Sequence, residues 1–197
     1  MMDAPEIRAM FVRFPVVSMI VAAWTLSLPA ADRVVLIQPV WDDMPPHYVT
    51  ICGGRSPHYQ QLVLKAGRHS PSDEWIMHQV RPDTYLFEST DPFYRNRFIN
   101  VYNKTVRSDP LRDAHQACLY PRQPLHDEWK ISVPLPGIVA LQATNTEFEN
   151  SFLTRVTTSN PAFNAVAIRQ LLPERVPDTY FRIIDVTPTR PMIVNAK

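Results

Sequence analysis

The chain has 197 residues and a formal net charge of +1 at pH 7. This length suits one domain with its own core, and the near-zero charge provides no field that would attract nucleic acid. With 45% hydrophobic and 20% charged residues, the composition excludes a disordered polyelectrolyte and a polytopic membrane protein. Twenty Pro against four Gly favour strands and turns, because Pro breaks helix interiors and suits edge strands.

The first 31 residues differ in composition from the rest of the chain. Two arginines precede an uncharged run of eighteen residues, 14–31, which Asp32 ends. This order resembles a secretory signal with cleavage near the end of the run. A membrane anchor is the second interpretation, since a spanning helix needs ~20 apolar residues, and a buried N-terminal segment is the third. We therefore expect a signal peptide or anchor over 1–31 and a single domain over 32–197, with a membrane as partner only if 1–31 are retained.

Short runs rich in β-branched and aromatic residues fill the chain from residue 34 to residue 187. They alternate with clusters of Pro, Asn, Asp and Ser, and the first of them are "RVVLIQPVW", "HYVTIC" and "QQLVLK". Such runs are typical of strands, and a helix competes only at 162–172, "AFNAVAIRQLL". The pattern predicts an all-β domain, either a barrel or a sandwich.

An acidic and aromatic triplet opens three of these runs. Trp75 and Trp129 follow Asp-Glu and are 54 residues apart, and Tyr180 follows Asp-Thr 51 residues later. Three similar units favour a β-trefoil with about four strands in each lobe, and a β-sandwich or jelly roll is the alternative. Alternation along a strand lets the three aromatic side chains fill one core layer, with the acids at its rim. The expected lobes are 47–80, 84–133 and 138–186.

The sequence contains no recognisable catalytic or metal-binding motif. Its six His are spread singly, without the i,i+4 pair of a helical zinc site. Cys52 and His58 provide a thiol and a base, but no third group that would orient the base. Carboxylate pairs such as Asp42-Asp43 are typical of solvated loops. We therefore expect a protein that is not an enzyme and has no cofactor and no metal.

Two features bear on the cellular compartment. Asn103-Lys104-Thr105 is an N-glycosylation sequon, which we expect in a surface loop. Cys52 and Cys118 are the two cysteines, and the sequence leaves open whether they form a disulfide bond or are two small buried side chains. We expect a secreted, extracellular protein, with a membrane-anchored protein or a component of an assembly as the alternative.

The stretch "YVTICGGRSPHYQQLVLK" supplies the candidate binding residues. Two of the four Gly stand together in the loop of the predicted first hairpin, and a basic residue follows them. With the triplicated strands, this resembles the β-trefoil protease inhibitors, both the Kunitz type and the fungal mycocypins. The resemblance implies that a backbone without Cβ atoms enters the cleft of a papain-like protease, although a tight turn explains the same glycine pair. The candidate binding-loop residues are Cys52, Gly53, Gly54, Arg55 and Ser56.

Two other functions compete with protease inhibition. Ricin-like carbohydrate-binding trefoils carry Gln-x-Trp in each lobe, where this chain has Asp-Glu-Trp twice and Asp-Thr-Tyr once. The Trp is kept and the Gln is not, and Tyr94, Tyr102 and Tyr120 are candidates to stack on a sugar ring. A structural subunit of a larger complex or capsid is the third function. The expected partner is a protein, such as a protease, or a glycan.

Overall fold

The computed structural model describes residues 32–40, 45–52, 60–105, 115–156, 165–170 and 173–187. The strands are β1 (Arg33–Pro39), β2 (His47–Ile51), β3 (Gln60–Ala66), β4 (Trp75–Arg81), β5 (Thr84–Ser89), β6 (Arg97–Thr105), β7 (His115–Pro121), β8 (Trp129–Leu135), β9 (Ile138–Ala143), β10 (Ser151–Val156), β11 (Ala165–Gln170) and β12 (Phe181–Asp185). The short 3-10 helices are η1 (Pro92–Tyr94), η2 (Thr146–Phe148) and η4 (Pro173–Thr179). The all-β prediction is confirmed, including the strand at β11. None of the described residues forms a helix that is long and apolar enough to cross a membrane.

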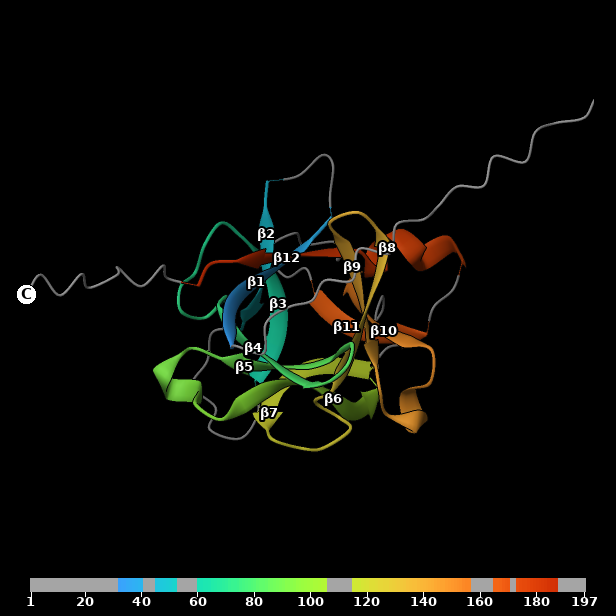
Figure 1. Cartoon of the computed structure of the whole chain (residues 1–197), viewed down its shortest axis with the longest axis horizontal. Helices are drawn as coiled ribbons and strands as arrows, with labels where there is room; N and C mark the ends of the chain where they lie inside the picture. Colours follow the sequence, from blue (N-terminus) through green and yellow to red (C-terminus); the bar gives the residue numbers. More distant parts are fainter. Residues whose placement is uncertain are drawn as a thin grey trace, which may run out of the picture.

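Six of the strands close into an antiparallel barrel (Figure 1). Strand β4 pairs with β1 and β5, β8 pairs with β5 and β9, and β12 pairs with β9 and β1. Two tight turns in this ring have Pro at the first central position and a residue with positive φ at the second. These turns are Pro82-Asp83, with φ 59° at Asp83, and Pro136-Gly137, with φ 73° at Gly137.

The other six strands form three hairpins, β2–β3, β6–β7 and β10–β11, which we call the cap. Strands β3, β7 and β11 also pair with one another, so the hairpins meet around a pseudo-three-fold axis. In Figure 1 the three hairpins lie at the upper left, at the bottom and at the right of the centre. The three units are β1–β4, β5–β8 and β9–β12, so the first unit also includes β1, which precedes the predicted start at residue 47. This arrangement is β-trefoil-like.

Residues at equivalent positions of the barrel strands pair with one another in each of the three units. The first residue of β4, β8 and β12 is an aromatic residue with 0% exposure, and the residue two places later is apolar. The paired residues are Trp75↔Ser89 with Met77↔Phe87, Trp129↔Ala143 with Ile131↔Leu141, and Phe181↔Pro39 with Ile183↔Ile37. The alternation expected of strands therefore places the aromatic side chains in one core layer, as the sequence predicts for Trp75 and Trp129.

The third aromatic residue of the repeat is Phe181, and the sequence prediction of Tyr180 is wrong by one position. Tyr180 is half-buried, while Phe181 is fully buried and opens β12. The backbone confirms the register, because the Tyr180 carbonyl accepts the N–H of Val40 at 2.9 Å. The carbonyls of Glu74 and Glu128 accept the equivalent N–H groups of Thr90 and Thr144. The aromatic residues are thus 54 and 52 positions apart.

The period of 54 residues that separates the two Trp continues beyond them into the second and third units. Asp91 and Asn145 each accept the N–H two residues later and so begin η1 and η2. Asn96 and Asn150, also 54 apart, each adopt a positive φ, of 58° and 57°, in the turns that follow. The repeat therefore fixes turns and helix caps as well as core side chains.

The third unit departs from this pattern around helix η4. Arg155 occupies the strand position held by the buried Ile51 and Val101 in the other units, two residues after the core position. Its Nη2 contacts Asp178 of η4 at 2.7 Å, and its Nε contacts the same carboxylate at 3.1 Å. A half-buried ion pair thus takes the place of an apolar contact in this unit.

Two indole groups join the barrel to the cap. Trp75 Nε1 donates to the Val49 carbonyl of β2 at 3.2 Å, and Trp129 Nε1 donates to the Ile99 carbonyl of β6 at 3.0 Å. Both bonds are buried, so each one satisfies the indole N–H of the barrel and the backbone carbonyl of the cap. The side chain of Phe181 has no N–H group, so the equivalent bond to the cap cannot form in the third unit.

We predict that Trp129→Phe lowers the free energy of unfolding by about 1–3 kcal/mol, because the buried Ile99 carbonyl loses its donor. Urea denaturation followed by circular dichroism measures the change. The control is Phe93→Leu, at an aromatic side chain with 52% exposure, which should change stability by less than about 0.5 kcal/mol. Equal stability of Trp129→Phe and the wild type would contradict the role of the indole bond.

Candidate functional site

The Asp-Glu-Trp triplets belong to two copies of a turn in which the Asp side chain is buried. Nε of Arg68 lies 3.1 Å from Oδ2 of Asp73, and Nε of Arg122 lies 3.1 Å from Oδ2 of Asp127. Each Oδ2 also accepts a backbone N–H, from His69 at 2.8 Å and from Gln123 at 2.7 Å. Both Asp side chains have 0% exposure, so the expectation that the acids lie at a rim is wrong. An arginine five residues upstream makes this burial tolerable, because it supplies a charged donor.

The adjacent glutamates tie these turns to their surroundings. Nη2 of Arg68 lies 2.5 Å from Glu74, and Nη2 of Arg122 lies 3.6 Å from Glu128. Glu128 also pairs with Arg81 at the end of β4, so it links the first and second units. The repeated carboxylates are therefore used in holding turns together, and this supports reading the repeat as a feature of the fold.

His78 in β4 lies between two carboxylates, one of which belongs to Asp32, the first residue that the structure describes. Its Nδ1 is 2.7 Å from Asp32, and its Nε2 is 2.9 Å from Glu88. Glu88 also accepts the N–H of Asn96. A general base needs one ring nitrogen directed at a substrate, whereas both nitrogens of His78 already have partners. This cluster fixes the beginning of β1 against the β4–β5 hairpin.

Two further histidines flank the buried Phe148. The His115 ring packs against Phe148 at 4.7 Å between centroids, and His126 lies 6.0 Å away on the same ring. Burial lowers the pKa of His115 below its ordinary value. His126 Nε2 is 3.0 Å from the amide of Asn145. Within the described parts of the chain, no three His, Cys, Asp or Glu side chains gather as metal ligands do.

The two cysteines are separate thiols. The Cys52 N–H donates to the Gln61 carbonyl at 2.8 Å, and Gln61 pairs in turn with Cys118, so strand β3 lies between them. Cys118 is fully buried, and burial raises the pKa of its thiol to about 12. Cys118 therefore remains a protonated thiol at neutral pH and is not a nucleophile.

A ring of small side chains surrounds the pseudo-three-fold axis in the cap. On each hairpin, one of these residues faces another across the pair, and all six are buried. The pairs are Thr50↔Val63, Asn100↔Cys118 and Thr154↔Ala167. They lie on the opposite strand face from core residues such as Val49 and Leu64. Nδ2 of Asn100 is buried and has no hydrogen-bond partner among the described atoms.

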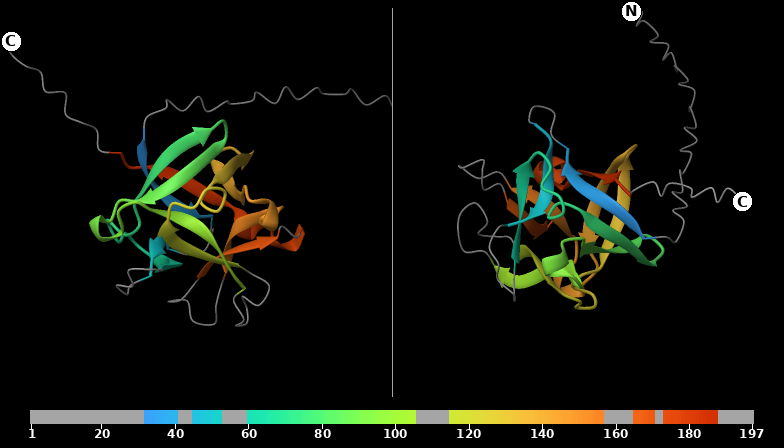
Figure 2. Two further views of the ribbon diagram at one scale, coloured as in Figure 1. Left: turned by 90° about the horizontal axis from the view of Figure 1, so that it is seen from below. Right: turned by 90° about the vertical axis from the view of Figure 1, so that its left-hand side faces the viewer.

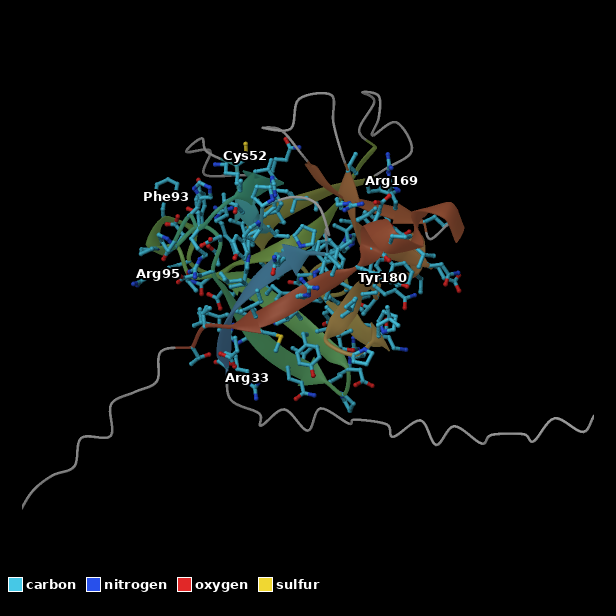
Figure 3. The ribbon with its side chains drawn as sticks, turned by 90° about the horizontal axis from the view of Figure 1, so that it is seen from above. Arg33, Cys52, Phe93, Arg95, Arg169 and Tyr180 are labelled. Carbon is cyan, nitrogen blue, oxygen red and sulfur yellow. The ribbon has the colours of Figure 1, made fainter. Side chains whose placement is uncertain are left out.

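The outer ends of the three hairpins lie together at this cap end. The strands on either side of 53–59, 106–114 and 157–164 are related by the pseudo-three-fold axis. Figure 3 shows Cys52 and Arg169 on this side of the molecule and Arg33 on the opposite side. The ends of the six hairpin strands therefore lie together at the cap end, and we take it as the candidate binding surface.

The predicted site residues are only partly within the described chain. Cys52 follows β2 and is half-buried, while Gly53, Gly54, Arg55 and Ser56 lie outside the described residues, as does His58. The backbone of Asn103 lies in strand β6, next to an irregular pairing register, and the expectation of a loop there is wrong. The loop was expected because a glycosylation sequon is typical of surface loops, whereas the strand continues through all three residues of the sequon.

Of the aromatic candidates for a sugar site, Tyr94 is a core residue. The exposed aromatic ring is its neighbour Phe93, with 52% exposure, which stands edge-on to Tyr94 at 4.8 Å. Asp91 Oδ1 accepts the N–H of Phe93 at 3.0 Å and so fixes its position at the start of η1. Figure 3 shows Phe93 on the same side of the molecule as Cys52. The sequence did not single out Phe93, because adjacent aromatic residues do not reveal which one is buried.

Solved structures share this fold at low sequence identity. The designed three-fold symmetric protein ThreeFoil matches with a TM-score of 0.59 and 11% identity, over 78% of this chain and 99% of that chain. Cytolethal distending toxin from Actinobacillus actinomycetemcomitans matches with a TM-score of 0.56 and 10% identity, over 82% and 96%. A salivary protein from Culex quinquefasciatus matches with a TM-score of 0.55 and 14% identity, over 80% and 96%. No protein-family model and no curated protein matches the sequence. The resemblance to β-trefoil proteins is thus confirmed for the fold alone.

We predict that one thiol of the native protein reacts with an aromatic disulfide reagent at pH 8 and that two react in guanidinium. Cys52 is half-exposed, whereas Cys118 is buried and its pKa is about 12. Absorbance of the released thiolate counts the reacted groups. Cys52→Ser is the matched control and should abolish the fast reaction. A protein with no reactive thiol until a reductant is added would contradict two separate cysteines.

We also predict opposite pH dependences for two aspartates. Burial raises the pKa of Asp127 despite the Gln123 N–H and Arg122, and its Oδ1 has no hydrogen-bond partner among the described atoms. The folded protein thus holds this proton to higher pH than the unfolded chain does. The contribution of Asp127 to stability should therefore rise as pH falls through its native pKa toward the ordinary value of an aspartate, and Asp127→Asn should remove this rise.

Asp185 is the matched comparison. Hydrogen bonds from the Thr187 N–H and hydroxyl lower its pKa, so its contribution is present at neutral pH and is lost as pH falls. Urea titrations of the wild type, Asp127→Asn and Asp185→Asn between pH 3 and pH 7 measure both effects. Wild-type-minus-variant differences that change in the same direction with pH would contradict this assignment.

Proposed function

We propose that this protein is an exported, non-catalytic binding protein that presents loops from a β-trefoil scaffold. The observation that carries the proposal is that the strand ends of the three cap hairpins lie together at the cap end, around one axis. Rigid paired strands hold both ends of each connection, which is the usual way in which a scaffold presents binding loops. The likeness to a toxin and to a salivary protein is consistent with a role outside the cell.

The polar groups of the scaffold support a role without catalysis. The buried Asp73 and Asp127 carboxylates accept backbone N–H groups of their own turns, and both nitrogens of His78 have carboxylate partners. The buried Cys118 has a pKa of about 12, which keeps its sulfur protonated. A nucleophile with an adjacent, oriented base is not found within the described parts of the chain.

The most concrete form of the proposal is protease inhibition by the loop that follows Cys52. Cys52 is held at the cap end by its hydrogen bond to Gln61, and the candidate residues Gly53, Gly54, Arg55 and Ser56 follow it directly in the sequence. A glycine pair permits close approach of backbone to a narrow cleft, and Arg55 supplies a basic side chain for a trypsin-like pocket. This form rests on the sequence of the loop, and the position of Cys52 is consistent with it.

We predict that Gly53→Trp or Gly54→Trp raises the inhibition constant against the sensitive protease by about tenfold or more, because the new side chain blocks close backbone approach. Papain and trypsin, each assayed with a fluorogenic peptide, represent the two protease classes. Gly137→Asn is the control, at a glycine with φ 73° whose added Cβ meets nothing within 4 Å. If the wild-type protein inhibits neither papain nor trypsin, the inhibitor form of the proposal is rejected.

Carbohydrate binding is the second candidate, and the exposed Phe93 favours it. An exposed ring beside polar groups is what a sugar-binding site uses to stack on a pyranose, and Arg95 lies exposed in the turn that follows η1. A glycan array with the wild type and Phe93→Ala separates the two candidates. Loss of glycan signals in Phe93→Ala, with protease inhibition absent, would favour this second function.

A further inference from the structure

The barrel end opposite the cap, which we call the open end, contains both ends of the described domain. The turns 82–83 and 136–137 and the gap between β12 and β1 are equivalent under the pseudo-three-fold register. In the left panel of Figure 2, the green β4–β5 hairpin, the start of β1 and the end of β12 lie at the top. The cyan β2–β3 hairpin of the cap lies at the bottom. The open end and the candidate binding surface therefore face in opposite directions.

The open end carries an exposed apolar hairpin tip at 133–138. Val133 is 50% exposed and Leu135 is 49% exposed, and the two prolines beside them are exposed as well. The tip projects beyond its neighbour, because Thr84, the first residue of β5, already pairs with Lys130. Val80, at the equivalent β4–β5 turn, is also among the large hydrophobic side chains that the described chain exposes.

These apolar side chains have no role in the core or in the turn. The turn itself needs only Pro136 and Gly137, with φ 73° at the glycine, and the bulge in β8 leaves 133 and 134 outside the pairing register. Exposed hairpin ends usually carry charged or polar residues, which prevent association. A tip with two large aliphatic side chains and two prolines is therefore suited to an apolar environment.

The chain enters the domain at this same end without a spacer. The uncharged run 14–31 ends one residue before Asp32, whose carboxylate is 2.7 Å from Nδ1 of His78, and β1 begins at Arg33. One extended residue spans at most about 3.6 Å. A bilayer that holds the run 14–31 would therefore lie directly against the open end.

We propose that the open end is a membrane-facing surface. Residues 14–31 stay on the chain and enter a lipid bilayer, Val133 and Leu135 insert into the surface of that bilayer, and the cap end faces away from it. The partner is a bilayer because a run of this length approaches the ~20 apolar residues of a spanning segment, while a protein partner would not need it. This inference goes beyond the proposed function and does not depend on which ligand the cap binds.

The first experiment uses two leucines with the same exposure, 49%, at different places in the fold. In the full chain with Cys52→Ser, either Leu135→Cys or Leu125→Cys is labelled with an environment-sensitive fluorophore, while the buried Cys118 stays unlabelled. After reconstitution into phosphatidylcholine vesicles, the label at 135 should shift to shorter wavelength and be quenched by a lipid-bound quencher. The label at 125, in the turn before β8, should do neither. Equal responses at both positions would overturn the proposal.

The second experiment measures partitioning of the full chain between water and the same vesicles. Val133→Asp together with Leu135→Asp should lower the partition constant by about tenfold or more, since burial of two aliphatic side chains is lost. Phe93→Asp together with Leu125→Asp is the matched control and should leave the constant unchanged. Without vesicles, the emission of the label at residue 135 should not depend on protein concentration. A shift with concentration would mean that the tip contacts a second copy of the chain, and it would overturn the proposal. The mass of the protein recovered from its native source tests whether 14–31 are kept, and a mass that corresponds to a chain starting near residue 32 would overturn the proposal as well.

Discussion

The hydrogen bonds that join the barrel to the cap are the interaction on which the structure depends. An aromatic residue at the start of β4, β8 or β12 fills the core layer nearest the cap, and the indole of Trp75 or Trp129 also reaches a cap carbonyl. Without this bond, a carbonyl of β2 or β6 would be buried and unsatisfied, at a cost of about 1–3 kcal/mol. One side chain thus sets both the depth of the core and the position of the hairpin above it.

The buried carboxylates extend the same principle to the turns. Each Asp-Glu pair lies directly before a closing Trp, so the turn that the acid holds also determines where the indole begins. Asp127 shows the energetic balance, because burial raises its pKa even though Arg122 and a backbone N–H oppose the shift. In the third unit, η4 replaces this turn and Arg155 pairs with Asp178. The chain can lose both the indole and the buried acid in one unit, since a different charge pair stabilises the turn there.

Much of the fold could be predicted from the sequence, because strands and core aromatic residues follow a period that survives in the residue types. The assignment of Tyr180 was wrong by one residue, since Asp-Thr-Tyr resembles Asp-Glu-Trp in letters while the helix before β12 shifts the register. The buried Asp73 could not be predicted, because its partner is an arginine five residues upstream and an isolated carboxylate is usually exposed. Phe93 was missed for a similar reason, since only the packing of η1 decides which of two adjacent rings faces solvent.

The topology of the chain places the cap end and the open end on opposite sides of the barrel. The three cap hairpins all lie on one side of the barrel, because they are equivalent under one rotation. The same rotation places the turns at 82–83 and 136–137 and the entry of the chain on the other side. A ligand at the cap and a membrane at the open end would therefore be kept apart by the full height of a closed barrel with no free edge.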